Sequence, residues 1–139
     1  MRQNISSNTI WEAAYGYSRA VRVGNIIEVS GTTAVQGESI VGLGDVKEQT
    51  IFIFQKIEKA LLEANATISD VVRTRMFVKD IAQSDTIGNV HAQFFKDIKP
   101  AASMIEVKGF IHPDILIEIE VTAVVNWNPS FPFSLYIHF

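Results

Sequence analysis

Short apolar runs and alternating segments mark the strands of this chain. The runs at 18–23 and 26–31 are joined by Gly24-Asn25, a pair suited to the positive φ of a tight turn, so we expect a β-hairpin there. A short strand near residues 39–43 lies among several glycines. Alternation over 70–80 predicts a strand with both faces covered. Two further strands, over 102–109 and 115–125, are predicted to close the fold.

Two segments have the 3.6-residue apolar period of helices. Residues 45–66 repeat apolar side chains on one face, with Asp45 suited to be the N-cap and Asn65 to a left-handed exit. A second helix begins at Ser84-Asp85 and ends before Pro100. The predicted order is β, β, short β, α, β, α, β, β. This order favours an α+β fold in which two helices pack on one face of a mixed sheet.

Strand alternation gives the sheet face without helices a mixed character. It predicts that this face carries apolar side chains together with charges of both signs: Arg73, Arg75, Phe77, Met104, Glu106, Glu118 and Glu120. Such a face is either a salt-bridged surface in contact with solvent or a subunit interface with paired charges.

Composition sharpens this choice and excludes several classes of function. The chain has 139 residues, of which 47% are hydrophobic and 19% charged, a balance that indicates one domain with apolar surface covered by copies of itself. The net charge of -3 disfavours nucleic acid as a partner. With no cysteine and with His91, His112 and His138 lacking ligand spacing, we expect no metal. We also expect no membrane contact and a cytoplasmic location, because the sequence has no apolar span or signal-peptide pattern.

The ordered motifs resemble the reactive intermediate deaminase family, RidA/YjgF, often labelled endoribonuclease L-PSP. The resemblance covers residues 10–125 and rests on Tyr17 before VRVGNIIEVSG, on ALLEANATISDVV, VRTRMFVKD and HAQFF, and on PAASMIEVKG with LIEIE and TAVV. It implies a chorismate mutase-like subunit in a homotrimer, with a small-molecule cleft at each subunit junction. It also implies hydrolysis of enamines and imines to carbonyl compounds and ammonia, without a cofactor.

The resemblance also carries residues of the cleft onto this chain, with one departure. Tyr17 and Glu118 match the family's tyrosine and the first glutamate of its Ile-Glu-Ile-Glu motif, whereas Ala102 stands where the family's carboxylate-binding arginine belongs. A guanidinium binds a carboxylate through a bidentate pair, so we expect an altered substrate preference. Gly88 and His91 replace a further asparagine and tyrosine of the pattern, which points to a divergent subgroup.

Each candidate residue has a second interpretation. Glu118 is either the proton-transferring or ligand-binding carboxylate or an ion-pair partner of Arg73 or Arg75, and Tyr17 lines either the cleft or a subunit edge, with Tyr15 as the fallback. The carbonyls at Gly31 and Met104 match positions that face water in the family. Arg19 and Arg75 could bind the substrate in place of the missing arginine, or form ion pairs. His91 either binds a polar group of the ligand or packs within the fold.

The resemblance predicts that the chain divides into a RidA-like domain over 1–125 and an aromatic tail over 126–139. The tail NWNPSFPFSLYIHF is either packed on its own or a neighbouring subunit, or disordered. Two functions compete with deamination: a non-catalytic metabolite-binding or regulatory trimer, and a ribonuclease, which the acidic net charge disfavours.

Overall fold

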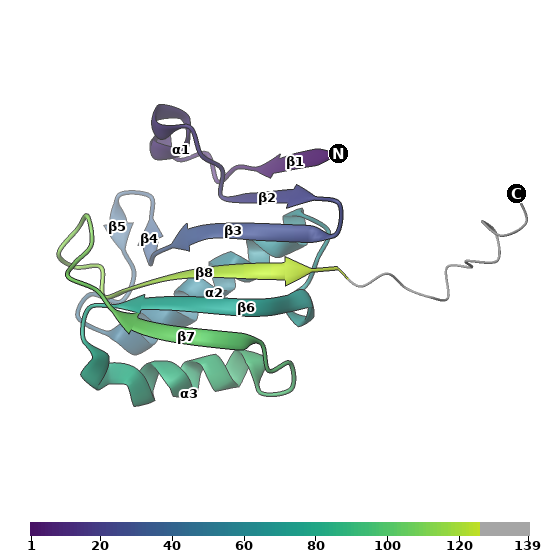
Figure 1. The fold of residues 1–139 in the computed structure, drawn as a ribbon. Coiled ribbons are helices and arrows are strands. Elements are labelled where there is room, and N and C mark those ends of the chain that lie inside the picture. The colour runs from purple at the N-terminus through teal and green to yellow at the C-terminus, as the bar shows by residue number, and fades with distance from the viewer. Residues whose placement is uncertain (126–139) are drawn as a thin grey trace, which may run out of the picture.

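A six-stranded mixed sheet forms the centre of the computed structural model, which describes residues 1–125. The strands are arranged in the order β1-β2-β3-β8-β6-β7 (Figure 1). Only β6 and β7 run parallel to each other, and the remaining neighbours are antiparallel. The bounds of the strands are β1 Arg2–Ile5, β2 Ala20–Val23, β3 Ile26–Thr32, β6 Val71–Val78, β7 Ala101–Glu106 and β8 Ile117–Val124. A separate hairpin pairs β4, Val35–Gln36, with β5, Ser39–Ile40.

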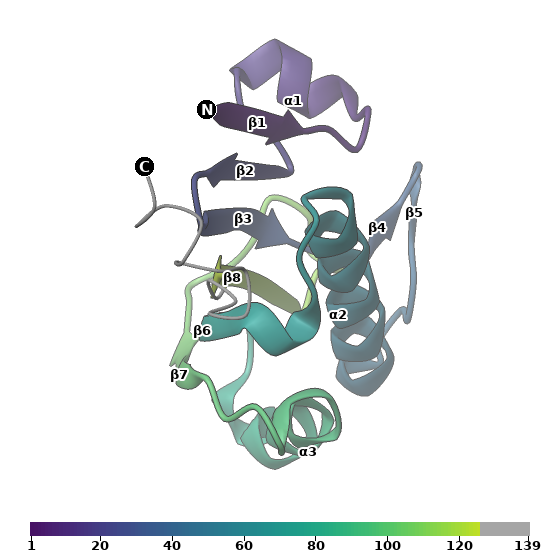
Figure 2. The ribbon, with the colours of Figure 1, turned by 90° about the vertical axis from the view of Figure 1, so that its right-hand side faces the viewer.

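Two helices cover one face of this sheet, as the sequence predicts. Helix α2 spans Val46–Glu63 and helix α3 spans Ser84–Phe95, and both lie on the same side of the strands (Figure 2). Asp45 is the N-cap of α2 and its side chain accepts a hydrogen bond from the amide of Glu48 at 3.1 Å. Asn65 follows the helix with a φ of 59°. The predicted cap and left-handed exit are therefore both confirmed.

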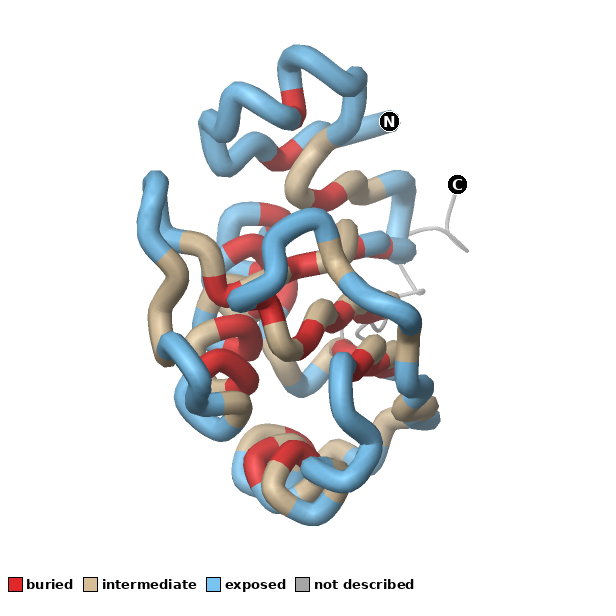
Figure 3. The backbone as a smooth tube through the Cα atoms, turned by 90° about the vertical axis from the view of Figure 1, so that its left-hand side faces the viewer, coloured by how far each residue is buried: buried red, intermediate tan, exposed pale blue. Residues whose placement is uncertain are grey.

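The hydrophobic core lies between the helices and the sheet. Its fully buried large side chains come from both layers: Phe54, Ile57 and Leu61 from α2, Phe95 from α3, and Ile117 and Ile119 from β8. In Figure 3 the buried positions alternate with less buried ones along the strands. The opposite face of the sheet has no helix over it within the described residues.

Strand β7 corrects one prediction about that uncovered face. Met104 is paired in register with buried Met76 and packs against the core, and Glu106 is in register with buried Val78. Both therefore lie on the helix side of the sheet, because residues paired in parallel strands point the same way. Ser103 and Ile105 take the predicted places of Met104 and Glu106 beside Arg75 and Phe77.

The first 20 residues contain two elements that the apolar pattern did not predict. Strand β1 extends the sheet beyond β2, and helix α1, Ile10–Tyr15, follows it. Tyr15, the fallback for Tyr17, does not lie on a strand: it ends α1 and stacks on Trp11 with ring centroids 5.6 Å apart.

Two short 3₁₀ helices lie in the connections between the larger elements. They span Ile68–Asp70 and Ile81–Gln83 and precede β6 and α3. None of the helices within residues 1–125 has the length and apolar character needed to cross a membrane. The aromatic tail over 126–139, for which we predict packing on a subunit, lies outside the described residues.

Candidate functional site

Glu118 and Gly31 face each other where β3 meets β8. The register between these strands shifts between Val29 and Thr32, and this irregularity brings Gly31 against the Glu118 side chain. A Cβ atom at Gly31 would lie 2.8 Å from the carboxyl carbon and 3.1 Å from each carboxylate oxygen. Gly31 has no positive φ, so the position needs glycine for space and not for backbone freedom.

Arg19 joins this pair from the residue that precedes β2. Its Nη2 donates a hydrogen bond of 2.6 Å to the Gly31 carbonyl oxygen, while its Nε is buried without a hydrogen-bond partner. Burial lowers the pKa of Arg19, and the nearby Tyr17, Glu12 and Glu118 oppose that effect. Arg19 is therefore the charged centre around which the other polar groups gather.

The protonation of Glu118 is set by opposing effects. Burial and the neighbouring carboxylate of Glu120 raise the pKa of Glu118, and Arg19 lowers it, with a net shift upward. A raised carboxylate pKa brings proton exchange closer to neutral pH, which suits acid–base catalysis. The predicted ion pair of Glu118 with Arg73 or Arg75 does not form: Arg75 lies 3.8 Å from Glu120 instead, and Arg73 donates to the Ser103 hydroxyl at 2.7 Å.

Tyr17 lies at the rim of an open cavity of about 420 Å³ and is 42% exposed. The backbone carbonyl of Glu12 accepts hydrogen bonds from the amides of Gly16 and Tyr17 at 3.0 and 3.1 Å. The buried Glu12 carboxylate accepts hydrogen bonds from the hydroxyls of Ser6, Ser7 and Thr9 and from the Ser7 amide. Burial raises the pKa of Glu12, but these hydrogen bonds outweigh it and the pKa is lowered. Glu12 thus fixes the turn that presents Tyr17.

A second cation approaches Arg19 from the helix layer. Lys56 of α2 donates to the carbonyls of Thr33 and Val35, just beyond the end of β3, at 2.8 and 2.9 Å. Burial, together with the charge of Arg19, lowers the pKa of Lys56 to about 8. Sequence reasoning missed both Lys56 and Glu12. The Thr9-x-x-Glu12 spacing of a capping box was a signal for Glu12, whereas nothing in the pattern distinguishes Lys56 from the other lysines of the helix.

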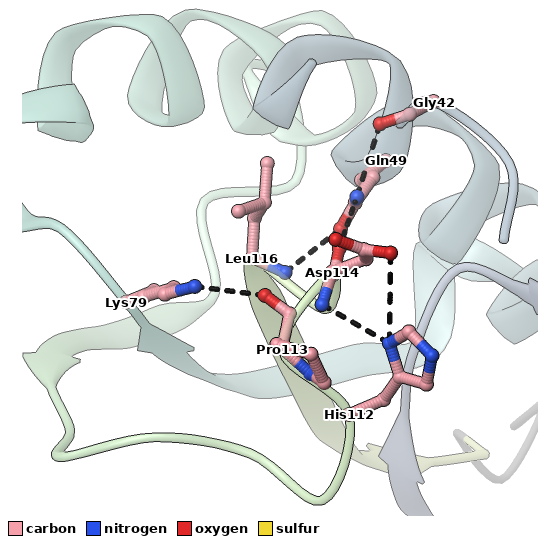
Figure 4. Close-up of polar contacts among 7 residues, drawn as sticks. All are labelled: Gly42, Gln49, Lys79, His112, Pro113, Asp114 and Leu116. Atoms are coloured by element: carbon pink, nitrogen blue, oxygen red, sulfur yellow. Dashed lines mark hydrogen bonds and ion pairs between the residues drawn. The ribbon is translucent and has the colours of Figure 1, made fainter. Parts of the chain in front are cut away.

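The start of β8 is held by a buried side chain of α2. Gln49 donates to the carbonyls of Gly42 and Asp114 at 3.0 and 2.9 Å and accepts from the Leu116 amide at 3.0 Å (Figure 4). Leu116 is two residues before Glu118 in the sequence. The amide of Gln49 therefore fixes the strand end from which Glu118 projects.

The remaining predicted residues gather at the other side of the sheet. Ala102 is in register with Thr74 on the helix side, and the Thr74 hydroxyl lies 2.9 Å from His91 Nε2. The His91 ring packs against Phe54 and Phe95, and burial lowers its pKa. Within one chain Ala102, Met104 and His91 therefore lie on the opposite sheet face from Glu118.

Two further features of residues 1–125 bear on ligand binding. Another open cavity, of about 570 Å³, contains none of the predicted site residues; it is lined by Ser69, Asn89, Ala92, Gln93, Phe94, Lys96, Asp97 and Ile98. Within the described part of the chain, no three His, Cys, Asp or Glu side chains are arranged to hold a metal ion.

Comparison with known proteins places this chain in a family. Residues 7–125 match the sequence model of the family described as Endoribonuclease L-PSP. An uncharacterized protein of Streptomyces coelicolor is 34% identical over 121 residues, 87% of this chain and 90% of that one. The 3-aminoacrylate deaminase RutC of Acinetobacter baylyi is 33% identical over 110 residues, 78% of this chain and 86% of the deaminase.

Solved structures agree with the sequence relatives. Rv2704 from Mycobacterium tuberculosis, a member of the YjgF/YER057c/UK114 family, is 45% identical and superimposes with a TM-score of 0.82 over 90% of this chain and 100% of that one. Yeast Mmf1 is 26% identical, with a TM-score of 0.80 over 91% of this chain and 100% of that one. The chain therefore has the chorismate mutase-like fold and belongs to the RidA/YjgF family.

Proposed function

We propose that this protein hydrolyses an enamine or imine to a carbonyl compound and ammonia in a small-molecule cleft between subunits. The observation that carries the proposal is the half-buried Glu118 carboxylate with its raised pKa, packed against Gly31 beside Arg19. The 33% identity to a 3-aminoacrylate deaminase supports the same class of reaction.

The chemistry needs one base, one water and a protonated imine. The Glu118 carboxylate takes a proton from water as the water oxygen bonds to the imine carbon, and the C=N double bond becomes a C–N single bond. The protonated carboxyl then returns that proton to the amine nitrogen, and the C–N bond breaks as ammonia leaves. The hydroxyl oxygen becomes the carbonyl, and its proton passes through the Glu118 carboxylate to ammonia, which is released as ammonium. An enamine enters the same sequence once its carbon has been protonated. Tyr17 would close over the planar substrate and donate a hydrogen bond to it.

A second copy of the chain would complete the cleft. Glu118 and Ala102 lie on opposite faces of one sheet, so a ligand cannot contact both within a single subunit. On the sheet face without helices, the apolar residues Val23, Ile26 and Ile105 are each more than half exposed to solvent. This exposed apolar surface supports burial of the face in a homotrimer. Light scattering should then give about three times 15.5 kDa, and a stable monomer would contradict the shared cleft.

The substrate preference should differ from that of relatives with the motif arginine. A hydrogen bond to a charged group contributes ~1.5–3 kcal/mol, so Ala102 costs an acidic imine roughly one to two powers of ten in binding. Imines without a carboxylate do not pay this loss. Their hydrolysis should therefore be favoured relative to 2-imino acids.

Ammonia release from enzymatically generated imines tests the proposal. Acidic and neutral imines should be compared for the parent and for Glu118→Gln, which keeps the shape of the side chain but removes the base. We expect faster release with the parent than with buffer alone, and loss of that acceleration in the variant. No acceleration with any of the imines would reject the enzymatic function.

A non-catalytic metabolite-binding or regulatory trimer is the alternative, favoured by one observation. The Gly31 carbonyl, which the family resemblance assigns to water, already accepts a hydrogen bond from Arg19. If the parent binds a metabolite without turnover and Glu118→Gln binds it equally well, the protein is a binder.

A further inference from the structure

Arg19 interacts with both sides of the Gly31–Glu118 contact. It donates a hydrogen bond to Gly31, and its charge acts on Glu118. Its 2.6 Å hydrogen bond fixes the Gly31 carbonyl, and Gly31 is packed directly against the Glu118 carboxyl group. The backbone amide of Arg19 donates to Ile5 of β1, and its carbonyl accepts from the Ser30 amide. The base of the side chain is thus held by two strands, and its tip is held by the residue beside Glu118.

The charges around Glu118 come from several elements. Glu120 lies on the same strand and is 3.8 Å from Arg75 of β6. Tyr17 and Glu12 raise the pKa of Arg19. The charge of Arg19 in turn lowers the pKa of Lys56. Within residues 1–125, Arg19 has no carboxylate within ion-pair distance, so it influences Glu118 through space and through the Gly31 backbone.

We propose that Arg19 is a positioning residue, which fixes the Gly31 backbone beside Glu118 and favours the carboxylate form of Glu118. The inference rests on the proposed function for its catalytic consequence, but the linkage between Arg19 and Glu118 can be measured without turnover. It assigns Arg19 a role in preparing the base, in place of direct binding of a substrate carboxylate.

Arg22 of β2, three residues after Arg19, provides a control. Its Nη1 donates a hydrogen bond of the same length, 2.6 Å, to the Ala64 carbonyl at the end of α2. That contact lies on the helix side of the sheet, away from Glu118. The Arg22 side chain also donates to the carbonyls of Gly24 and Asn65, so its loss removes more hydrogen bonds from the fold than loss of Arg19 does. It should nevertheless leave the titration of Glu118 unchanged.

The experiment is an NMR titration of carboxyl-labelled glutamate in the full chain. The Glu118 signal is assigned from the spectrum of Glu118→Gln, and its midpoint is compared in the parent, Arg19→Gln, Arg19→Lys and Arg22→Gln. We expect an upward shift of the midpoint in Arg19→Gln, a smaller shift in Arg19→Lys, and the parental midpoint in Arg22→Gln. An unchanged midpoint in Arg19→Gln, or an equal shift in Arg22→Gln, would overturn the inference.

Two further measurements keep the linkage testable if a variant fails to fold or if the protein shows no turnover. In the parent, the Arg19 side-chain nitrogen signals should shift with the same midpoint as the Glu118 carboxyl; signals that do not respond in that range would reject the linkage. Where turnover is present, the acidic limb of its pH profile should move to higher pH in Arg19→Gln and remain in place in Arg22→Gln. A shifted titration without turnover would uphold the linkage and reject the proposed function.

Discussion

Replacing Gly31 by alanine should displace the proposed base without unfolding the protein. The added Cβ would lie 2.8 Å from the Glu118 carboxyl carbon, whereas ordinary contact begins at 3.4 Å. The difference, 3.4 − 2.8 = 0.6 Å, is the smallest movement that relieves the overlap. Because the position has no positive φ, the backbone accepts alanine, and the side chain of Glu118 must yield.

The expected cost falls on chemistry more than on stability. A misplacement of about 1 Å at a reacting group costs ~10²-fold in rate, so a movement of 0.6 Å should reduce kcat/KM by about 10-fold or more. The steric cost to the fold is partly offset, since alanine removes ~0.4–1 kcal/mol of unfolded-state freedom. We therefore expect the free energy of unfolding to change by no more than about 1 kcal/mol.

Ammonia release, urea denaturation and a crystal structure of Gly31→Ala together test this reasoning. Gly109→Ala is the matched control, because a Cβ there meets nothing within 4 Å and the residue has no positive φ. The control should keep the parental rate. A Gly31→Ala protein in which Glu118 has moved by less than 0.6 Å, or which retains the parental rate, would refute the argument.

Three further predictions concern buried polar groups. Glu118→Gln should reduce ammonia release by ~10²-fold or more. The pKa of Glu118 in the folded protein is raised above its ordinary 4.5, so the parent should lose stability relative to this variant as pH rises from 4.5 through the raised pKa. Urea denaturation curves of the two proteins at several pH values would detect this loss. Lys56 has a pKa of about 8 in the folded protein, against its ordinary value of 10.5. As pH rises between these values, the parent should therefore gain about 1–2 kcal/mol of stability relative to Lys56→Met, after allowance for solvent screening. Equal pH dependence of the two unfolding free energies would contradict this. Gln49→Leu leaves the Asp114 carbonyl and the Leu116 amide without their partner, while the Gly42 carbonyl keeps the Asp45 amide. It should destabilise the fold by about 2 kcal/mol or more, whereas exposed Gln55→Leu on the same helix should change it by less than about 0.5 kcal/mol.

The sheet and its two covering helices could be predicted because their apolar patterns are regular. β6 alternates buried and less buried residues along most of its length, and α2 buries one face behind a conventional N-cap. The prediction for β7 assigned its side chains to the wrong faces of the sheet. The reason is that polar and apolar side chains do not alternate cleanly over residues 103–106. Its parity is set by pairing with β6, which is a tertiary contact.

Most of the candidate site that could be predicted is marked by a motif; Arg19 was a candidate only as a substitute for the missing arginine. Tyr17, Gly31 and Glu118 were found through the family resemblance, and the structure adds that Gly31 and Glu118 are in contact. Lys56 and Glu12 were missed, because the first is a lysine among several on a helix and the second belongs to a helix of six residues. Such short helices depend on local hydrogen bonds more than on apolar period.

The distribution of charge along β8 separates a structural end of the sheet from a reactive one. Glu120 is close to Arg75, and the Thr122 hydroxyl donates to Glu28 of β3 at 2.9 Å, so the polar groups toward the end of β8 have partners in neighbouring strands. Glu118, near its beginning, has no ion pair within the described residues. Burial opposes the charged forms of Glu118, Arg19 and Lys56 alike, so part of the unfavourable electrostatics of the fold is concentrated around Arg19. A ligand that accepts a proton from this cluster or neutralises its charge would recover part of that cost on binding.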